Sequence, residues 1–426
     1  MALGITGALL SLCITTFYGS SGPEGGDFYV YYDSFHRFEQ EPDKLYEWLE
    51  PDAPEHVKAR PFLYPPFALL PVGLFAKLPR AAAWPLWALL ETTLIVPLVL
   101  LAMRAARPPT RSARIHSGLA IASILTPLAW WELSIGQINI LVITLVAAAL
   151  VLHQKRRTPL AVFVLMLAGG IKLLPFVLVP VFVWWAGPKQ RLWAIALALL
   201  GGLVIAIGPA LWVTGTHGPR GALEATFRLN QTYFGRALPR GTSPGSFYYG
   251  SDAAGNFSIP ATTSRVVNKV ARRFTGAGLT ASQDHTVRRV AMGATLGFSG
   301  LFALLALRAM RARRTQLSLA GVLLCLILFA NVSTWAYHLV GLVLLVPALG
   351  WSNRVSSRVP WAGLTAAVCN WGVAVPYAIW ALGLDVPVLS GMADRGFSTL
   401  AAAAWVATLL LMLSRRVWKR RTSPAP

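Results

Sequence analysis

Long apolar runs recur along almost the whole of this 426-residue chain, and they constrain its fold more than any other feature. Hydrophobic residues make up 55% of the sequence and charged residues only 13%, too few to cover a soluble globule of this size. About 20 apolar residues cross the hydrocarbon core of a bilayer, and tilt or packing accommodates shorter runs. The runs lie at residues 3–17, 84–103, 115–130, 138–152, 192–213, 290–307, 317–330, 339–349, 361–382 and 400–413. We therefore predict an all-α protein that crosses the membrane many times.

Short clusters of lysine and arginine separate these runs, and they predict the orientation of the chain. The clusters lie at residues 104–114, 155–157, 189–191, 308–314, 354–358 and 415–421. Short basic loops face the cytoplasm in membrane proteins. The segment 20–67 carries ten acidic and four basic residues in a chain of net charge +21, so we expect it on the outer side.

Two segments depart from a simple count of crossings. Segment 64–79 is rich in proline and fits a juxtamembrane or re-entrant helix that does not cross; a crossing there would place the basic cluster 104–114 outside. Segment 159–185 is too long for one pass and is interrupted by Gly169-Gly170 and Pro175, so we expect two short helices that meet near Lys172. The result is about 12 crossings with both termini inside.

The domain organisation follows from this topology. We expect one transmembrane domain over residues 1–426, with outer loops at 20–83 and 214–289 and juxtamembrane helices in the first loop. The first apolar run lacks a basic segment before it, so no cleavable signal peptide is expected. The three cysteines fall in apolar runs, which argues against a disulfide framework. No glycine-rich nucleotide-binding motif stands in a strand–helix context, and no nucleic acid is expected as a partner.

Polar motifs gather in the connections that this topology places outside. In chain order they read D-F-x-V-Y-Y, Y-P-P-F, G-Q-x-N, I-K-x-x-P, N-Q-T and S-x-W-x-x-H, between about residues 20 and 350. This ordered series resembles glycosyltransferase family 87 of the GT-C superfamily. The resemblance implies a GT-C fold in the plasma (inner) membrane and an active site on its outer face. It also implies transfer of a sugar from a polyprenyl-phosphate donor to a lipid- or glycan-linked acceptor, with mannose the first choice and arabinofuranose the second.

Asp27 opens the first motif, directly after Gly25-Gly26. An aspartate in such a place is typical of a helix start. By resemblance it matches the acidic residue that serves as catalytic base in the first outer loop of GT-C enzymes. A phosphate leaving group needs little protonation, so one carboxylate that takes the acceptor's proton suffices for an inverting displacement. Asp33 and the acids after it are expected on a solvated surface. No D-x-D pair stands out, and neither a metal nor a cofactor is expected.

Five cationic or imidazole side chains are candidates for binding the donor phosphate, namely Lys172, Arg228, Arg236, Arg240 and His338. A charge between two apolar helices usually has a partner or a function, although Lys172 could also extend to the interface. Guanidinium groups suit bidentate phosphate contacts, but they also make a long loop soluble. His338 follows Tyr337 where the family often has a second histidine, and a structural hydrogen bond remains its alternative role.

Candidates for sugar or acceptor contacts are Tyr64, Trp131, Gln137, Asn139, Asn230, Gln231 and Trp335. The amides could instead cap or join helices, and the tryptophans could belong to the interfacial aromatic belt. A transporter or flippase of lipid-linked sugars is the rival function, and the absence of a repeat between two halves counts against it. A scaffold that partners other envelope enzymes is a third reading.

Overall fold

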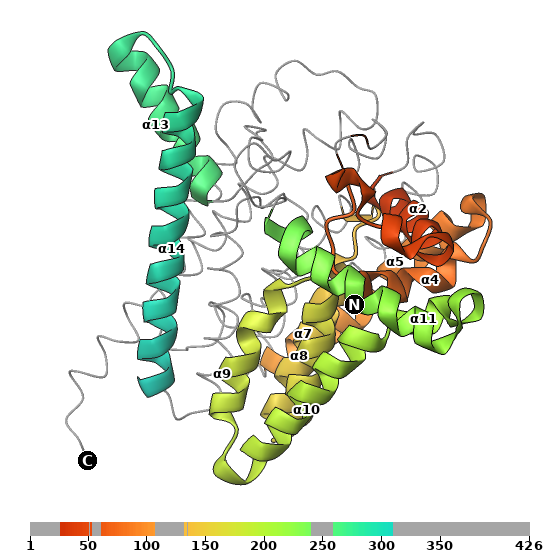
Figure 1. Ribbon diagram of the computed structural model, residues 1–426. Helices are drawn as coiled ribbons and strands as arrows, with labels where there is room; N and C mark the ends of the chain where they lie inside the picture. Colours follow the sequence, from red (N-terminus) through yellow and green to blue (C-terminus); the bar gives the residue numbers. More distant parts are fainter. Residues whose placement is uncertain are drawn as a thin grey trace, which may run out of the picture. The chain divides into compact units, whose positions relative to one another are not determined.

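The computed structural model describes residues 26–50, 52, 61–106, 132–133, 135–239 and 259–309, and these ranges contain helices and no strand (Figure 1). The chain divides into two compact units. The first comprises Met1–Leu101 and Glu132–Gly250, and the second comprises Ala102–Trp131 and Ser251–Pro426. The first unit holds all the predicted site residues that the structure describes. The predicted division into one domain with outer loops stays a prediction.

Helix α8 (Thr158–Ile171) forms the centre of the first unit, because it packs against both α7 (Asn139–Gln154) and α10 (Pro188–Ile207). The predicted break near Lys172 is confirmed. Lys172 follows α8 in an extended conformation, and a short 3-10 turn, η4 (Leu174–Val177), leads into α9 (Leu178–Trp185). Pro175 has no backbone N–H to donate, so a continuous helix would lose a hydrogen bond there.

The predicted run 192–213 is wrong as a single helix. Helix α10 ends at Ile207, and α11 (Ala210–Thr232) begins after Gly208 and Pro209. Pro209 cannot donate the hydrogen bond that a continuous helix would need. Helix α11 is kinked at Gly218, which has a φ of 66°, and it runs into a π-helical turn, η5 (Tyr233–Ala237).

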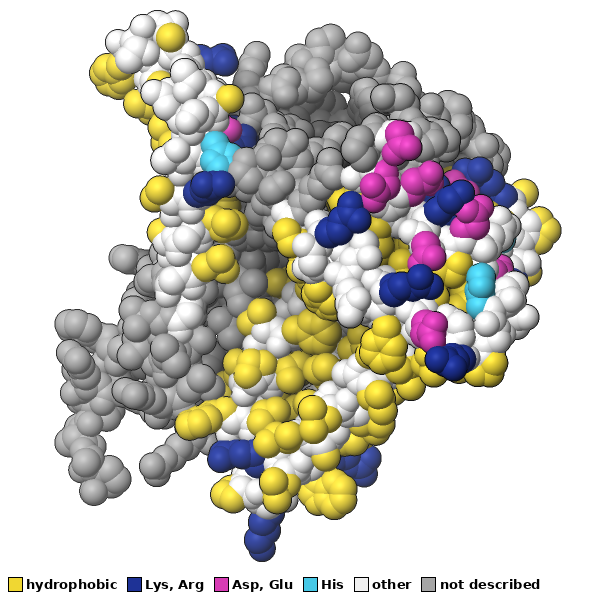
Figure 2. Space-filling model, viewed as in Figure 1, with side chains coloured by type: hydrophobic (Ala, Val, Ile, Leu, Met, Phe, Trp, Pro, Cys, Tyr) yellow, Lys and Arg dark blue, Asp and Glu magenta, His cyan; other side chains and the backbone are white. Residues whose placement is uncertain are grey.

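Two of the described helices are long and apolar enough to cross a membrane, namely Arg80–Ala105 within α5 (Arg80–Ala106) and α10. The outer surface of α10 is apolar, with Leu192 77% and Leu199 71% exposed (Figure 2). Such side chains are suited to contact lipid. The predicted runs at 3–17, 115–130, 317–330, 339–349, 361–382 and 400–413 lie outside the described residues.

The proline-rich segment 64–79 folds as a 3-10 turn, η3 (Pro66–Ala68), followed by α4 (Leu69–Ala76). At 1.5–2 Å per residue these two elements extend about 18 Å, which is short of the ~30 Å hydrocarbon core. This length agrees with the expectation that the segment does not cross. The predicted total of 12 crossings is not tested by the described helices.

Helix α2 (Asp27–Gln40) is amphipathic and packs on α4 and α11. Its buried face carries Phe28, Tyr31, Phe35 and Phe38, spaced three, four and three residues apart. Two 3-10 turns follow, η1 (Pro42–Lys44) and η2 (Glu47–Leu49). The apolar face of α2 therefore holds this segment against α4 and α11.

Acidic side chains on the exposed face of this segment pair with basic residues from elsewhere in the unit. Oxygen-to-nitrogen distances are 3.7 Å for Asp33–Arg80, 3.8 Å for Asp43–Arg228 and 3.0 Å for Glu50–Arg236. Figure 2 shows acidic and basic side chains interspersed over α2 and α11. Such exposed pairs contribute at most about 1 kcal/mol each. Together they offset part of the net negative charge of the acidic segment.

Candidate functional site

Two glycines let the start of α2 approach the segment before α7. A Cβ added to Gly26 would lie 2.4 Å from the carbonyl oxygen of Ile135. Gly136 has a φ of 70°, and a Cβ there would lie 2.5 Å from the Cβ of Phe28 and 2.2 Å from the Trp84 ring. Neither position has room for a larger residue, and the left-handed backbone of Gly136 disfavours other residues as well. The close contact places Asp27 beside Gln137.

The side-chain amide of Gln137 joins several groups, and only 1% of this residue is exposed. Its Nε2 donates to the Oδ2 of the half-buried Asp27. Its Oε1 accepts from the Tyr31 hydroxyl at 3.1 Å and from the Lys172 ammonium at 3.2 Å. The Tyr64 hydroxyl lies 3.4 Å from the same oxygen. One neutral amide therefore bridges a carboxylate and an ammonium group.

Asn139 makes the second bridge, from the first position of α7. Its Oδ1 accepts from the Nζ of Lys172, and its Nδ2 donates to the Oε2 of Glu132 at 2.9 Å. The backbone N–H of Asn139 donates to the other carboxylate oxygen of Glu132. Glu132 is fully buried, and its negative charge lies at the N-terminus of α7, where the helix dipole favours it.

These contacts form one network, which we call the Gln137 cluster. Its members are Asp27, Tyr31, Tyr64, Glu132, Gln137, Asn139 and Lys172. The residues come from α2, from the segment after η2, from the segment that leads into α7 and from the break between α8 and η4. All of them belong to the first compact unit.

Lys172 supplies the positive charge of the Gln137 cluster. Two of its ammonium N–H groups are directed at Gln137 and Asn139, and its Nζ lies 5.4 Å from the ring centroid of Tyr64. Burial lowers the pKa of Lys172, and attraction to Glu132 counteracts this shift. Burial raises the pKa of Glu132, and Lys172 and the hydrogen bonds from Asn139 counteract it. Glu132 therefore stabilises the ionised form of Lys172, and Lys172 stabilises the ionised form of Glu132.

Tyr31 keeps its proton, because burial raises its pKa well above the ordinary value. Its hydroxyl is thus a stable donor to Gln137, and it fixes the orientation of the amide. Because the Oε1 of Gln137 faces the donors of Tyr31 and Lys172, its Nε2 faces the carboxylate of Asp27. Tyr31 was not among the site residues predicted from the sequence, although it lies in the D-F-x-V-Y-Y motif four residues after Asp27. This separation is one turn of the helix.

The structure brings Asp27, Tyr64, Gln137, Asn139 and Lys172 together, and it places other predicted site residues elsewhere. Arg228 and Arg236 are exposed and pair with Asp43 and Glu50. The side-chain amide of Asn230 donates to the backbone oxygens of Ala206 and Thr226, and Gln231 is exposed. Trp131, Arg240, Trp335 and His338 lie outside the described residues.

Two buried acids near Lys172 were not among the site residues predicted from the sequence. Glu132 follows Trp130-Trp131 at the end of an apolar run, and Glu91 lies inside the predicted crossing 84–103. Glu91 is 1% exposed, and its carboxyl group is near the backbone of Leu141 in the first turn of α7. An ionisable residue in or beside an apolar run is a useful signal of a functional site. Within the described ranges, no group of three or more His, Cys, Asp or Glu side chains could hold a metal ion.

Comparison with known proteins identifies one family. A family model described as glycosyltransferase family 87 matches residues 62–333, which is more than half of the chain. No curated protein and no solved structure matches the chain. The match covers five of the seven members of the Gln137 cluster, namely Tyr64, Glu132, Gln137, Asn139 and Lys172, while Asp27 and Tyr31 precede its first residue.

We predict that Glu132→Gln destabilises the protein by about 1.5–3 kcal/mol, because a buried acceptor of two hydrogen bonds loses its charge beside Lys172. Thermal unfolding of the purified protein in detergent measures this effect. Asp33→Asn is the matched control, since Asp33 also faces a cation but its side chain is 52% exposed. The control should change stability by less than about 0.5 kcal/mol. Equal unfolding temperatures for wild type and Glu132→Gln would contradict the assigned role of Glu132.

Proposed function

Since the chain belongs to glycosyltransferase family 87, it is a glycosyltransferase, and we propose that the Gln137 cluster is the centre at which it transfers the sugar. The observation that carries this proposal is the amide of Gln137, which contacts both the carboxylate of Asp27 and the ammonium of Lys172. A sugar-phosphate donor needs a cation at its phosphate, and an acceptor hydroxyl needs a base. The cluster offers one group of each kind.

Asp27 is the proposed general base. It is the first residue of α2 and is only half-buried, so an acceptor hydroxyl can approach it. The dipole of α2 favours a negative charge at its first residue, and the hydrogen bond from Gln137 favours the ionised carboxylate of Asp27 as well. Gln137 is a neutral amide and does not transfer its proton to the carboxylate. The carboxylate therefore remains able to take the acceptor's proton while the acceptor oxygen attacks the anomeric carbon. Attack opposite the phosphate inverts that carbon.

Lys172 is the proposed contact for the donor phosphate. An ammonium group has three donors, and two of them are used by Gln137 and Asn139. Among the described residues the third N–H has no hydrogen-bond acceptor, so it can contact a phosphate oxygen. Glu132 accepts a hydrogen bond from Asn139, whose Oδ1 accepts from Lys172, so this acid is linked to the lysine through a neutral amide. Gln137 and Asn139 would then set the orientation of the lysine, and Tyr64 would lie against the sugar.

A polyprenyl-phosphate sugar is the donor that we propose, and the outer face of the membrane is the proposed location of the reaction. Two helices that can span a membrane and the apolar surface of α10 support a lipid-linked substrate. Mannose is the first choice of sugar and arabinofuranose the second, with a lipid- or glycan-linked acceptor. Arg228 and Arg236 remain predicted phosphate contacts, and to serve as such they would have to leave weak exposed pairs with Asp43 and Glu50.

Asp27→Asn should lower turnover by about 10²–10⁴-fold, because it keeps the size of the side chain and removes the proton acceptor. Membranes that contain the full chain are incubated with polyprenyl-phosphate mannose, or with the arabinofuranose donor, and the glycosylated product is quantified. Asp33→Asn is the control, since Asp33 lies on the same helix but is exposed and paired with Arg80. Near-normal transfer by Asp27→Asn, at equal expression, would exclude Asp27 as the base.

Lys172→Met should raise the KM for the donor by about 10–100-fold, the effect of losing one hydrogen bond to a charged group. The apolar stem of the side chain is retained, so helix packing is preserved. Initial rates over a range of donor concentrations give KM and kcat separately, and thermal unfolding gives stability. A large loss of stability with an unchanged donor KM would show that Lys172 is structural and does not contact the phosphate.

A further inference from the structure

The second part of α11, after the kink at Gly218, returns to the end of α10. The side-chain Nδ2 of Asn230 donates at 3.3 Å to the backbone oxygen of Ala206, which lies in the last turn of α10. Ala210 begins α11 just after that turn, so the start of α11 and Asn230 both lie beside the end of α10. The second part of α11 therefore meets the C-terminal end of a helix that is long and apolar enough to span a membrane.

Three exposed apolar side chains share the face of α11 and η5 that carries Asn230. Leu223 and Phe227 lie seven and three residues before Asn230, and Phe234 lies four residues after it. This spacing puts side chains on one side of a helix. They are 39%, 52% and 52% exposed, and we call them the Leu223 ridge. Because Asn230 is directed at the end of α10, the Leu223 ridge faces the same side as that end.

The charged side chains of this stretch lie on a different face. Arg220, Glu224 and Arg228 are spaced four residues apart, and their side chains are 94%, 60% and 63% exposed. Glu224 and Arg228 each follow a member of the Leu223 ridge by one residue, which is about 100° around the helix. A helix with an apolar face and a separate charged face is typical of the boundary between membrane and water.

The surface of α10 continues the Leu223 ridge. Leu192, Leu199 and Leu203 are exposed along α10, and Figure 2 shows an apolar surface over this helix, with charged side chains gathered over α2 and α11. Helix α10 is predicted to cross the membrane, and its exposed leucines then contact lipid. Its C-terminal end would lie at the outer boundary of the hydrocarbon, which is the level that the ridge faces.

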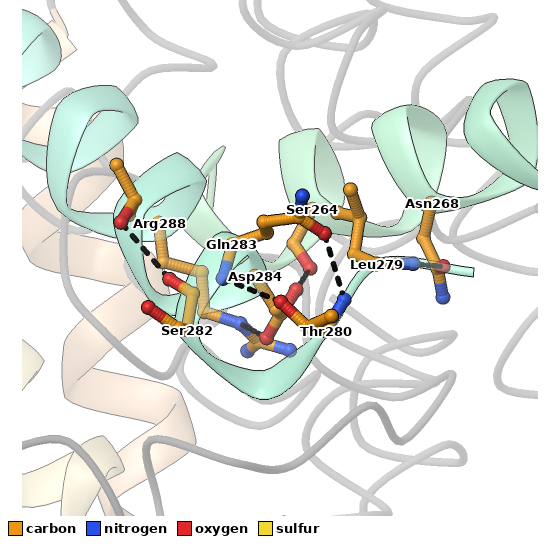
Figure 3. A network of polar contacts seen from close by, with 9 residues as sticks. Ser264, Asn268, Leu279, Thr280, Ser282, Gln283, Asp284 and Arg288 are labelled. Atoms are coloured by element: carbon orange, nitrogen blue, oxygen red, sulfur yellow. Dashed lines mark hydrogen bonds and ion pairs between the residues drawn. The ribbon is translucent and has the colours of Figure 1, made fainter. Parts of the chain in front are cut away.

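A second helix with exposed apolar side chains belongs to the other compact unit, namely α13 (Ile259–Thr275), which packs on α14 (Ala281–Ala309). Ser264 Oγ donates to Asp284, and the N–H of Leu279 donates to Asn268 Oδ1 at 2.8 Å (Figure 3). These contacts make α13 antiparallel to α14. The end of α13 thus lies by the turn, away from the apolar run 290–307. Exposure alone therefore does not indicate lipid contact, and the direction of the Leu223 ridge is the stronger observation.

We propose that the Leu223 ridge inserts into the outer leaflet of the membrane, at the boundary between phospholipid headgroups and acyl chains. The second part of α11 then lies along the membrane surface, with Arg220 and Arg228 on the water side. Helix α11 also packs on α2, η1 and η3, so its attachment to lipid would hold the segment that begins with Asp27 close to the membrane. This inference depends on the predicted crossing of α10 and is independent of the roles proposed for the Gln137 cluster.

The accessibility of spin labels in the full-length protein tests this proposal. The three native cysteines are replaced by serine, and a nitroxide is attached at Phe227→Cys, at Glu224→Cys or at Leu199→Cys of α10, in phosphatidylcholine vesicles. Oxygen concentrates among acyl chains, whereas a nickel chelate stays in water. Relative to the chelate, oxygen should reach the label at 227 several-fold better than the label at 224. The label at 227 should thus resemble the one at 199, which reports on the predicted crossing.

A charge placed in the ridge gives a second measurement. With the label at Leu223→Cys, Phe227→Asp should raise contact with the nickel chelate several-fold, because a carboxylate draws the helix out of the apolar layer. Gln231→Asp is the matched control, since position 231 is exposed on the charged side, and it should leave the label unchanged.

Three results would overturn the proposal. The first is equal access of the nickel chelate to labels at 224 and 227, and the second is the absence of any effect of Phe227→Asp on the label at 223. The third is a label at 227 that is shielded from both reagents, which would show that protein and not lipid covers the ridge. Free access of the chelate to the label at 199 would remove the predicted crossing of α10, and the proposal with it.

Discussion

The close approach of two backbone segments at Gly26 and Gly136 is the constraint on which the site depends. Any side chain at Gly26 would collide with the carbonyl of Ile135, and any at Gly136 would collide with Phe28 and Trp84. Phe28 is also held between the rings of Trp84 and Trp87, with centroids 5.5 and 5.6 Å apart. This packing fixes the first turn of α2 on the segment before α7. The hydrogen bond between Gln137 and Asp27 follows from that position.

The charges of the site are arranged around neutral amides. Gln137 separates Lys172 from Asp27, and Asn139 separates Lys172 from Glu132. A direct ion pair between Lys172 and Asp27 would occupy both of the groups that the proposed reaction needs. Amide bridges hold both groups in place without pairing the two charges directly. The cost of burying Glu132 is offset by two hydrogen bonds from Asn139 and by the dipole of α7.

Sequence patterns predicted much of the first unit because local rules govern it. The apolar run of α7 and the break at Lys172 follow from hydrophobic length and proline chemistry. The break between α10 and α11 was missed, although Pro209 marks it. Contacts between residues far apart in the sequence could not be predicted from such local patterns. The pairs Asp43–Arg228 and Glu50–Arg236 join residues about 185 positions apart, and only the folded chain shows that these arginines face carboxylates.

The central claim is that Gln137 and Asp27 act as one unit in sugar transfer, and a double-mutant cycle tests it most directly. Turnover is measured for Gln137→Met, for Asp27→Asn and for the two changes together, at saturating donor. If Gln137 acts by orienting Asp27, the second change should add little, and the double variant should be about as active as Asp27→Asn alone. Losses that multiply in the double variant would show that the two residues act independently, and would contradict this account of the site.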